Sequence, residues 1–137
     1  MSEVDHVLRI LGEKRPPLGV WFDMEDGDYY KSKNNSPLSR ENGQMYSEIC
    51  RTFCQKMIDS GFGYCGVYAS KYILENVLSI SDLNIWLAQW ANCVTFNGKY
   101  DFWQCSSVGK VDGIDGNVDI DFCYKNFDVF RSVKENE

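Results

Sequence analysis

The sequence predicts an α/β fold with a largely parallel sheet. Strand-like and helix-like segments alternate over the first part of the chain, and three strand-like segments with little helix between them follow. The chain has 137 residues, 44% of them hydrophobic, which is enough for one domain with a substantial core. There is no internal repeat or linker in the sequence, so we expect a single domain over residues 1–137, with a charged, disordered tail from about residue 133.

The first element is a helix predicted over residues 3–13. Its apolar residues recur at the spacing that places them on one helical face, namely Val4, Val7, Leu8 and Leu11. Two consecutive prolines follow shortly afterwards, so the chain leaves the helix before the next element.

Residues 18–26 read as a buried strand that ends in acids. Its side chains alternate between the two faces of a sheet, so Asp23 and Glu25 project to the same side. Repulsion between neighbouring carboxylates raises the pKa of one of them, which keeps an acid protonated beside an ionised partner. A glycosidase or another acid/base enzyme needs such a pair. The alternative is a strand end that runs into a solvated acidic turn at residues 26–28.

The remaining elements follow the same reasoning. Residues 26–43 are polar and predict a long loop, which leaves the acids and is placed to wall a cleft. A helix is predicted next, because apolar residues recur every four positions at Ile49, Phe53 and Met57. It spans residues 44–60, and it is followed by a strand at 64–69, a short helix at 71–78, and strands at 83–90, 100–105 and 116–122.

Polar residues stand at the carboxyl ends of several predicted strands. They are Asp23, Glu25, Ser70, Gln89 and Gln104. In α/β folds, sites form at this edge of the sheet. This convergence strengthens the interpretation of Asp23 and Glu25 as a functional acid pair, with the solvated turn as the alternative.

Composition and charge exclude several classes of function. The net charge of −6 and the scattered lysines and arginines argue against nucleic acid as a partner. No apolar stretch reaches 18 residues, so no membrane span is predicted, and the acidic start of the chain does not resemble a signal peptide.

The six cysteines include no CxxC pair, and His6 is the only histidine, so we expect buried free thiols and no metal or other cofactor. Nucleophilic catalysis would require His6 to meet a cysteine through folding alone.

Five short segments stand out in order along the chain. They are residues 20–25 (VWFDME), 66–70 (GVYAS), 85–88 (IWLA), 103–107 (WQCSS) and 111–119 (VDGIDGNVD). Their order and spacing resemble glycoside hydrolase family 25, over about residues 3–124. Members of this family are muramidases, lysozymes that cleave the β-1,4 bond between N-acetylmuramic acid and N-acetylglucosamine in peptidoglycan.

The resemblance implies an incomplete TIM-like (β/α) barrel. The family fold has eight strands, and the match here begins at the helix before the fourth strand, so about the last five strands are represented. The first three strands, and an active-site aspartate on the first of them, have no counterpart. Two strand edges would then be left open, one beside Trp21 and Phe22 and one beside Val118 and Ile120. Open apolar edges recruit partners, so we expect homo-oligomers.

The resemblance also implies roles for the acids. Glu25 matches the general acid that protonates the departing glycosidic oxygen, and Asp23 matches its partner acid. In a substrate-assisted route, Asp23 would orient the 2-acetamido group of the sugar as it attacks the anomeric carbon. Asp119 matches an acid on the last strand that lines the same pocket, and Asp121 is the less favoured choice there.

Three further residues match positions in the family's cleft, namely Tyr68, Trp86 and Gln104. Aromatic side chains suit the apolar faces of sugar rings, and the amide of Gln104 suits hydroxyl or amide groups. Core packing remains the alternative for Tyr68 and Trp86. The other large aromatic residues of these segments are expected in the core, namely Trp21, Phe22, Trp90 and Trp103. Cys105 stands where the family pattern has a tyrosine.

The resulting hypothesis is a peptidoglycan hydrolase represented by its C-terminal portion. The partner would be the glycan strands of peptidoglycan, and the resemblance implies action outside the cell or in the cell wall. Because part of the catalytic set has no counterpart, a glycan-binding module without turnover is the alternative. A domain that serves only folding or assembly is the third possibility.

Overall fold

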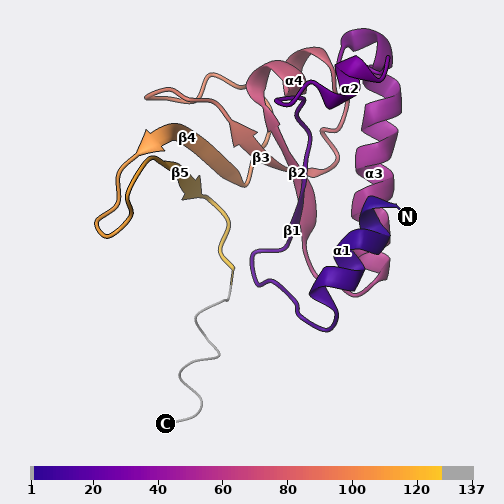
Figure 1. Ribbon diagram of the computed structural model, residues 1–137, viewed down its shortest axis with the longest axis horizontal. Helices are drawn as coiled ribbons and strands as arrows, with labels where there is room; N and C mark the ends of the chain where they lie inside the picture. The colour runs from indigo at the N-terminus through magenta and orange to yellow at the C-terminus, as the bar shows by residue number, and fades with distance from the viewer. Residues whose placement is uncertain (1, 128–137) are drawn as a thin grey trace.

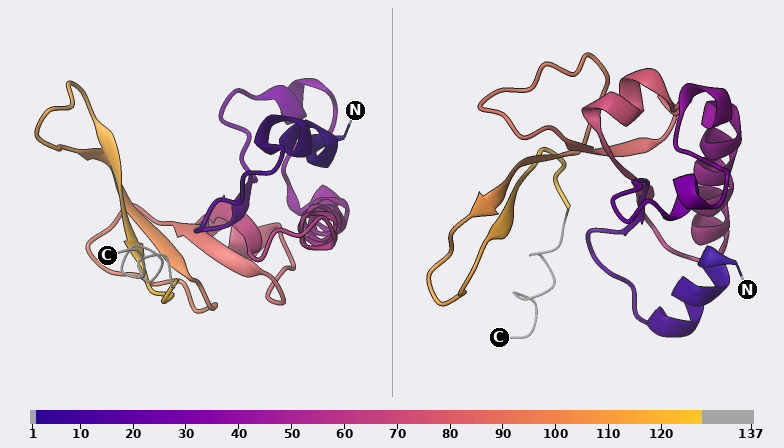
Figure 2. Two further views of the ribbon diagram at one scale, coloured as in Figure 1. Left: turned by 90° about the horizontal axis from the view of Figure 1, so that it is seen from below. Right: turned by 45° about the horizontal axis from the view of Figure 1, so that its top comes forward.

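The computed structural model describes residues 2–127 and shows a mixed α/β fold built on one curled sheet of five strands (Figures 1 and 2). The tail predicted to be disordered from about residue 133 lies outside the described residues. The elements are α1 (Glu3–Leu11), β1 (Val20–Asp23), α2 (Tyr30–Lys33), the 3-10 helix η1 (Arg40–Asn42), α3 (Gly43–Asp59), β2 (Cys65–Ser70), α4 (Lys71–Asn76), β3 (Asn84–Ala88), β4 (Phe102–Gly109) and β5 (Val118–Cys123).

The sheet has the order β1-β2-β3-β4-β5. The first four strands are parallel, as the sequence predicts, and β5 returns antiparallel to β4. The sheet curls into half a barrel, with α3 along one side and the β4–β5 hairpin projecting at the other end (Figure 2). The outer edges of β1 and β5 pair with no other described strand.

Helix α1 confirms the first predicted helix, although it ends at Leu11. The Ser2 hydroxyl accepts a hydrogen bond from the Asp5 backbone at 3.2 Å, and the Asp5 carboxylate accepts one from the Ser2 backbone at 3.0 Å. This reciprocal pair satisfies donors that a helix start leaves without partners. Gly12 takes a positive φ of 55° just after the helix, a conformation that glycine adopts without steric cost.

The loop predicted at residues 26–43 contains two short helices, α2 and η1. Asp26 organises the first of them: its carboxylate accepts from the Lys31 and Ser32 backbones at 2.8 and 3.1 Å and from the Ser32 hydroxyl at 2.6 Å. These hydrogen bonds, chiefly that from the Ser32 hydroxyl, lower the pKa of Asp26. A short helix held by side-chain capping needs no periodic apolar residues, so hydrophobic periodicity in the sequence does not predict it.

The core lies between α3 and one face of the sheet. Phe53 of α3 stacks on Phe22 of β1 with ring centroids 4.5 Å apart, and Met57 is fully buried. The expected core positions of Phe22 and Trp103 are confirmed, since Phe22 packs against the core and Trp103 belongs to it. The helix predicted at residues 44–60 is therefore confirmed, and Phe53 and Met57, two of the apolar residues that recur along it, face the core.

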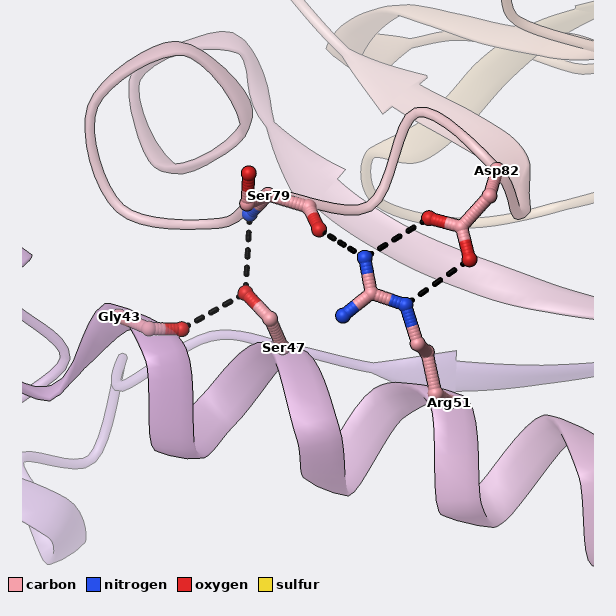
Figure 3. Close-up of polar contacts among 5 residues, drawn as sticks. All are labelled: Gly43, Ser47, Arg51, Ser79 and Asp82. Atoms are coloured by element: carbon pink, nitrogen blue, oxygen red, sulfur yellow. Dashed lines mark hydrogen bonds and ion pairs between the residues drawn. The ribbon is translucent and has the colours of Figure 1, made fainter.

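A small polar network ties α3 to the segment between α4 and β3 (Figure 3). The Ser47 hydroxyl donates to the Gly43 carbonyl at 2.7 Å and accepts from the Ser79 backbone at 2.9 Å. One turn later, the Arg51 guanidinium forms two hydrogen bonds of 2.8 Å with the Asp82 carboxylate and also donates to the Ser79 carbonyl. Ser47 is buried, whereas the Arg51–Asp82 pair is exposed.

All six cysteines are free thiols. Cys50, Cys54 and Cys65 are buried as expected, while Cys93 and Cys123 are exposed, which corrects the expectation for those two. Burial raises the pKa of Cys50 to about 12, so this thiol stays protonated and packs as a small apolar side chain. None of the helices within residues 2–127 has the length and apolar character that a bilayer-spanning helix needs.

Candidate active site

Asp23, the last residue of β1, and Glu25, two residues beyond it, lie on the face of the sheet opposite α3. The strand ends at Asp23, and pairing with β2 continues through the Met24 backbone, which donates to the Tyr68 carbonyl at 2.9 Å. Met24 turns into the core and is only 1% exposed. Asp23 and Glu25 therefore share the opposite face, as the alternation along this segment predicts.

A cleft of about 540 Å³ opens over this face of the sheet. Its lining residues are Trp21, Asp23, Glu25, Tyr68, Trp86, Trp90, Gln104, Asp119 and Asp121. The structure thus brings together all six residues that the sequence singles out. It adds Trp21, Trp90 and Asp121 to them. The cleft's volume falls within the usual range of small-molecule sites.

Asp23 and Glu25 both have a raised pKa. For Asp23 the cause is burial, partly opposed by the charge of Lys31. For Glu25 the first cause is burial and the second is the negative charge of Asp23, again opposed by Lys31. Lys31 is held beside them because its ammonium donates to the carbonyl oxygen of Glu25. Such an environment favours the protonated form that a general acid requires.

Two more acids reach the cleft from β5. Asp119 accepts a hydrogen bond from the Gln104 amide nitrogen at 3.2 Å, and Asp121 accepts one from the Trp86 indole at 2.8 Å. Burial raises the pKa of Asp121, with the charge of Asp119 acting in the same direction. The sequence reading preferred Asp119 to Asp121, but two residues apart on a strand they face the same side, and the structure places both in the cleft.

Tyr68 and Trp86 both pack against neighbours and line the cleft. The Tyr68 hydroxyl donates to the Gln104 side-chain oxygen at 2.9 Å. Burial and the charges of Glu25 and Asp23 raise the pKa of Tyr68 to about 12. Trp86 stacks on Phe102 with centroids 4.9 Å apart and meets Tyr68 edge to face at 5.9 Å. Tyr68 and Trp86 therefore contribute both to core packing and to the cleft, the two alternatives that the sequence leaves open for them.

The expectation that Trp21 and Trp90 lie in the core is wrong. Trp21 is partly buried and lines the cleft, and Trp90 is 66% exposed. A signal in the sequence could have found both. Trp21 stands two residues before Asp23, and Trp90 stands four residues after Trp86. Because side chains an even number of positions apart share a face of a strand, alternation predicts both tryptophans on the cleft face.

Two polar residues that the sequence places at strand ends serve the scaffold. Ser70 caps α4, where its hydroxyl accepts from the Ile73 backbone at 3.3 Å. The Gln89 side chain bonds within the loop after β3, donating to the Thr95 hydroxyl at 2.9 Å and accepting from the Thr95 backbone at 3.1 Å. Neither lines the cleft.

A larger hollow of about 630 Å³ lies at the opposite ends of β2 and β3, against α3. Two of its charged groups, Arg51 and Asp82, bind each other, and its Cys65 thiol has a raised pKa caused chiefly by a hydrogen bond with Cys54. We favour the acidic cleft as the functional site because paired carboxylates and aromatic faces converge there.

No protein-family model matches the chain, and no curated protein sequence does either. Solved structures do resemble it. Two structures of the modular autolysin LytC from Streptococcus pneumoniae, one of them in complex with a synthetic peptidoglycan ligand, have a TM-score of 0.70 at 19% and 20% identity, over 86% of this chain. The crystal structure of the CTP1L endolysin has a TM-score of 0.61 at 22% identity, over 88% of this chain. The matched region is 29% of the LytC chain and 40% of the CTP1L chain, and at these identities the likeness shows the fold.

Proposed function

We propose that the chain is the C-terminal part of a peptidoglycan hydrolase whose complete form is a TIM-like barrel of the family 25 muramidase type. One observation carries the proposal: Asp23 and Glu25, both with raised pKa, share a cleft with Asp119 and several aromatic side chains. The likeness in fold to an autolysin and an endolysin supports the same substrate class. The bond attacked would be the β-1,4 link between N-acetylmuramic acid and N-acetylglucosamine, and the site of action the cell wall or the space outside the cell.

In this proposal Glu25 is the general acid. Its raised pKa favours the protonated form, and the proton passes to the glycosidic oxygen as the bond to the anomeric carbon breaks. Asp23 stabilises the positive charge that develops on the sugar, either directly or by orienting its 2-acetamido group. Asp119 lines the other side of the cleft, and the aromatic side chains receive the apolar faces of the sugar rings.

The test is the release of reducing ends from purified peptidoglycan, by the chain itself and by a version extended with the first three barrel strands. We expect Glu25→Gln to lower the rate of the active form by about 10²-fold or more, because general acid catalysis contributes that much. Asp115→Asn is the matched control, since Asp115 lies in the β4–β5 turn and is exposed. A Glu25→Gln variant as fast as the parent would refute the role of Glu25, and an inert extended version would refute the proposed activity.

A glycan-binding module without turnover is the second candidate. It is favoured by the aromatic wall of the cleft, to which Trp21, Tyr68, Trp86 and Trp90 all contribute in the part of the barrel described. Calorimetry with chitooligosaccharides or muropeptides separates the two candidates: a module binds them and releases no reducing ends. A domain that serves only folding or assembly would show neither binding nor hydrolysis.

A further inference from the structure

Trp90 is an exposed aromatic residue that is nevertheless held in one orientation. Its side chain is 66% exposed at the cleft, beyond the end of β3. Its indole nitrogen donates to the side-chain oxygen of Gln104 at 2.8 Å, and Gln104 is only 5% exposed. The ring's one polar atom is therefore tied to a buried partner, while its apolar surface stays open to the cleft.

The backbone beneath Trp90 is fixed as well. The Gln89 backbone donates to the Gln104 carbonyl at 3.1 Å, and the buried Trp103 indole donates to the Gln89 carbonyl at 2.8 Å. The Gln89 side chain bonds to Thr95 and closes the loop that follows. A side chain held at both its base and its tip loses little conformational entropy when a ligand covers it.

Gln104 is the residue that sets this arrangement. Its oxygen accepts from the Trp90 indole, which can only donate, and from the Tyr68 hydroxyl. Its nitrogen donates to the Asp119 carboxylate. In the reverse orientation, the NH₂ group of the amide would face the Trp90 N–H and its oxygen would face the Asp119 carboxylate. The observed orientation is therefore the one that satisfies every group.

We infer that Trp90 forms a sugar-stacking subsite at the rim of the cleft, and that Gln104 is the positioning residue that holds its ring. This inference rests on the proposed function. The chemical class of ligand is a β-1,4-linked N-acetylated glycan, because a pyranose ring has apolar C–H faces that pack on an indole and polar edges that meet the acids of the cleft. Gln104 acts on the glycan through Trp90, Tyr68 and Asp119, which already engage its amide.

Chitotetraose is the probe, and binding is measured with the intact chain by calorimetry and by the NMR signals of the tryptophan indole N–H groups. We expect Trp90→Ala to weaken binding about tenfold, and Trp90→Phe to weaken it less, because the ring remains but loses its anchor. Tyr72→Ala is the matched control, since Tyr72 is an equally exposed aromatic residue, 68%, outside the cleft.

Gln104 has its own readout. We expect Gln104→Leu to shift the Trp90 indole signal of the free protein and to weaken chitotetraose binding. Gln104→Glu should bind poorly at pH 7 and recover as the pH falls towards 4.5, relative to the parent chain at the same pH. The reason is that only the protonated carboxyl group can both accept from Trp90 and donate to Asp119. A residue that merely fills space would show neither the indole shift nor the recovery.

The outcomes separate the inference from the proposed function. If chitotetraose shifts other indole signals and Trp90→Ala binds as tightly as Tyr72→Ala, the subsite is refuted while glycan binding stands. If the parent chain hydrolyses peptidoglycan and Trp90→Ala and Trp90→Phe do so equally well, the subsite is again refuted. If the parent chain does not bind chitotetraose and the extended version does not hydrolyse peptidoglycan, the proposed function is refuted and the subsite is refuted with it.

Discussion

Asp23, Glu25 and Asp26 are close neighbours in the sequence and have pKa shifts of opposite sign. Partial burial raises the pKa of the first two, whereas hydrogen bonds from Ser32 and Lys31 lower the pKa of Asp26. The difference follows from the backbone: the first two face the cleft, and Asp26 folds back to cap α2. One acidic run thus supplies both candidate catalytic groups and the residue that shapes the adjoining loop.

The raised pKa of Glu25 predicts a stability effect at the residue scale. A raised pKa in the folded state means that the protonated acid is favoured there, so this stabilisation is present at low pH and is lost as pH rises through the folded pKa. Glu25→Gln removes the charge, and we expect its Tm at pH 7 to exceed that of the parent by a small amount, on the order of 2 °C.

Thermal unfolding followed by circular dichroism from pH 3.5 to 7 measures this effect. The difference between Glu25→Gln and the parent should shrink towards pH 3.5, where both side chains are neutral. Asp115→Asn serves as the control, since Asp115 is an exposed acid in the β4–β5 turn and does not line the cleft. A Glu25→Gln variant that is less stable than the parent at pH 7 would show that the ionised carboxylate is stabilised, contrary to the assignment.

At the scale of elements, close contact between β1 and β2 shapes the cleft floor. Gly66 of β2 leaves room for the Trp21 ring of β1: a Cβ at this position would lie 2.4 Å from Trp21 Cζ3 and 2.6 Å from the Asn84 carbonyl oxygen. Trp21 in turn meets Trp86 edge to face at 5.6 Å. The absence of a side chain at Gly66 of β2 therefore allows aromatic residues of β1 and β3, the strands on either side of β2, to meet under the cleft.

Gly66→Ala should accordingly destabilise the protein by roughly 1–3 kcal/mol, the usual cost of overpacking. The matched control is Gly63→Ala, because a Cβ there meets no atom within 4 Å and Gly63 has no positive φ. Urea unfolding measures both variants. Equal stability of the two would mean that Trp21 moves freely and does not form a fixed floor.

The connection between α3 and the segment before β3 gives a second element-scale prediction. Ser47→Ala should cost about 1–3 kcal/mol, because it removes both hydrogen bonds of the buried Ser47 hydroxyl and leaves the Ser79 backbone N–H without its acceptor. Asp82→Asn should cost less, about 0–1 kcal/mol, since the Arg51–Asp82 pair is exposed. Urea unfolding of the two variants side by side tests the ranking, and the reverse order would contradict it.

At the scale of the whole molecule, the half-barrel leaves β1 and β5 as the edges of the described sheet. The exposed apolar side chains near β5 include Phe122 and Tyr124. A full barrel of this type would pair both edges, and an unpaired edge offers free backbone donors and acceptors to another chain. The matched region is 29% of the autolysin chain, and we predict that the two unpaired edges of the described sheet favour self-association.

We expect the isolated chain to form oligomers as its concentration rises, and Ile120→Lys on β5 to weaken them. The control is Ile10→Lys, since Ile10 is an exposed isoleucine, at 62%, on α1 away from the sheet edges. Size-exclusion chromatography with light scattering measures the mass. A parent chain that stays monomeric at every concentration, or an Ile10→Lys effect as large as that of Ile120→Lys, would contradict the assignment to the open edge.

Much of the fold and of the candidate site could be predicted from the sequence. Strand alternation placed Asp23 and Glu25 on one face, helical periodicity located α3, and the order of the segments predicted a largely parallel sheet. The short helices after β1 were missed because capping by Asp26 leaves no periodic trace. The prediction that Trp90 lies in the core is wrong because it rests on the apolar character of the residue and not on its alternation with Trp86.

What the sequence by itself determined is which side chains share a face, because that depends only on local backbone geometry and on the pattern of apolar residues. What only the tertiary structure decided is which faces meet. The curl of the sheet brings acids from β1 and β5 to one cleft, although 94 positions in the sequence separate Glu25 from Asp119. The orientation of Gln104 was likewise decided there, because its three partners come from separate parts of the chain and must all be satisfied at once.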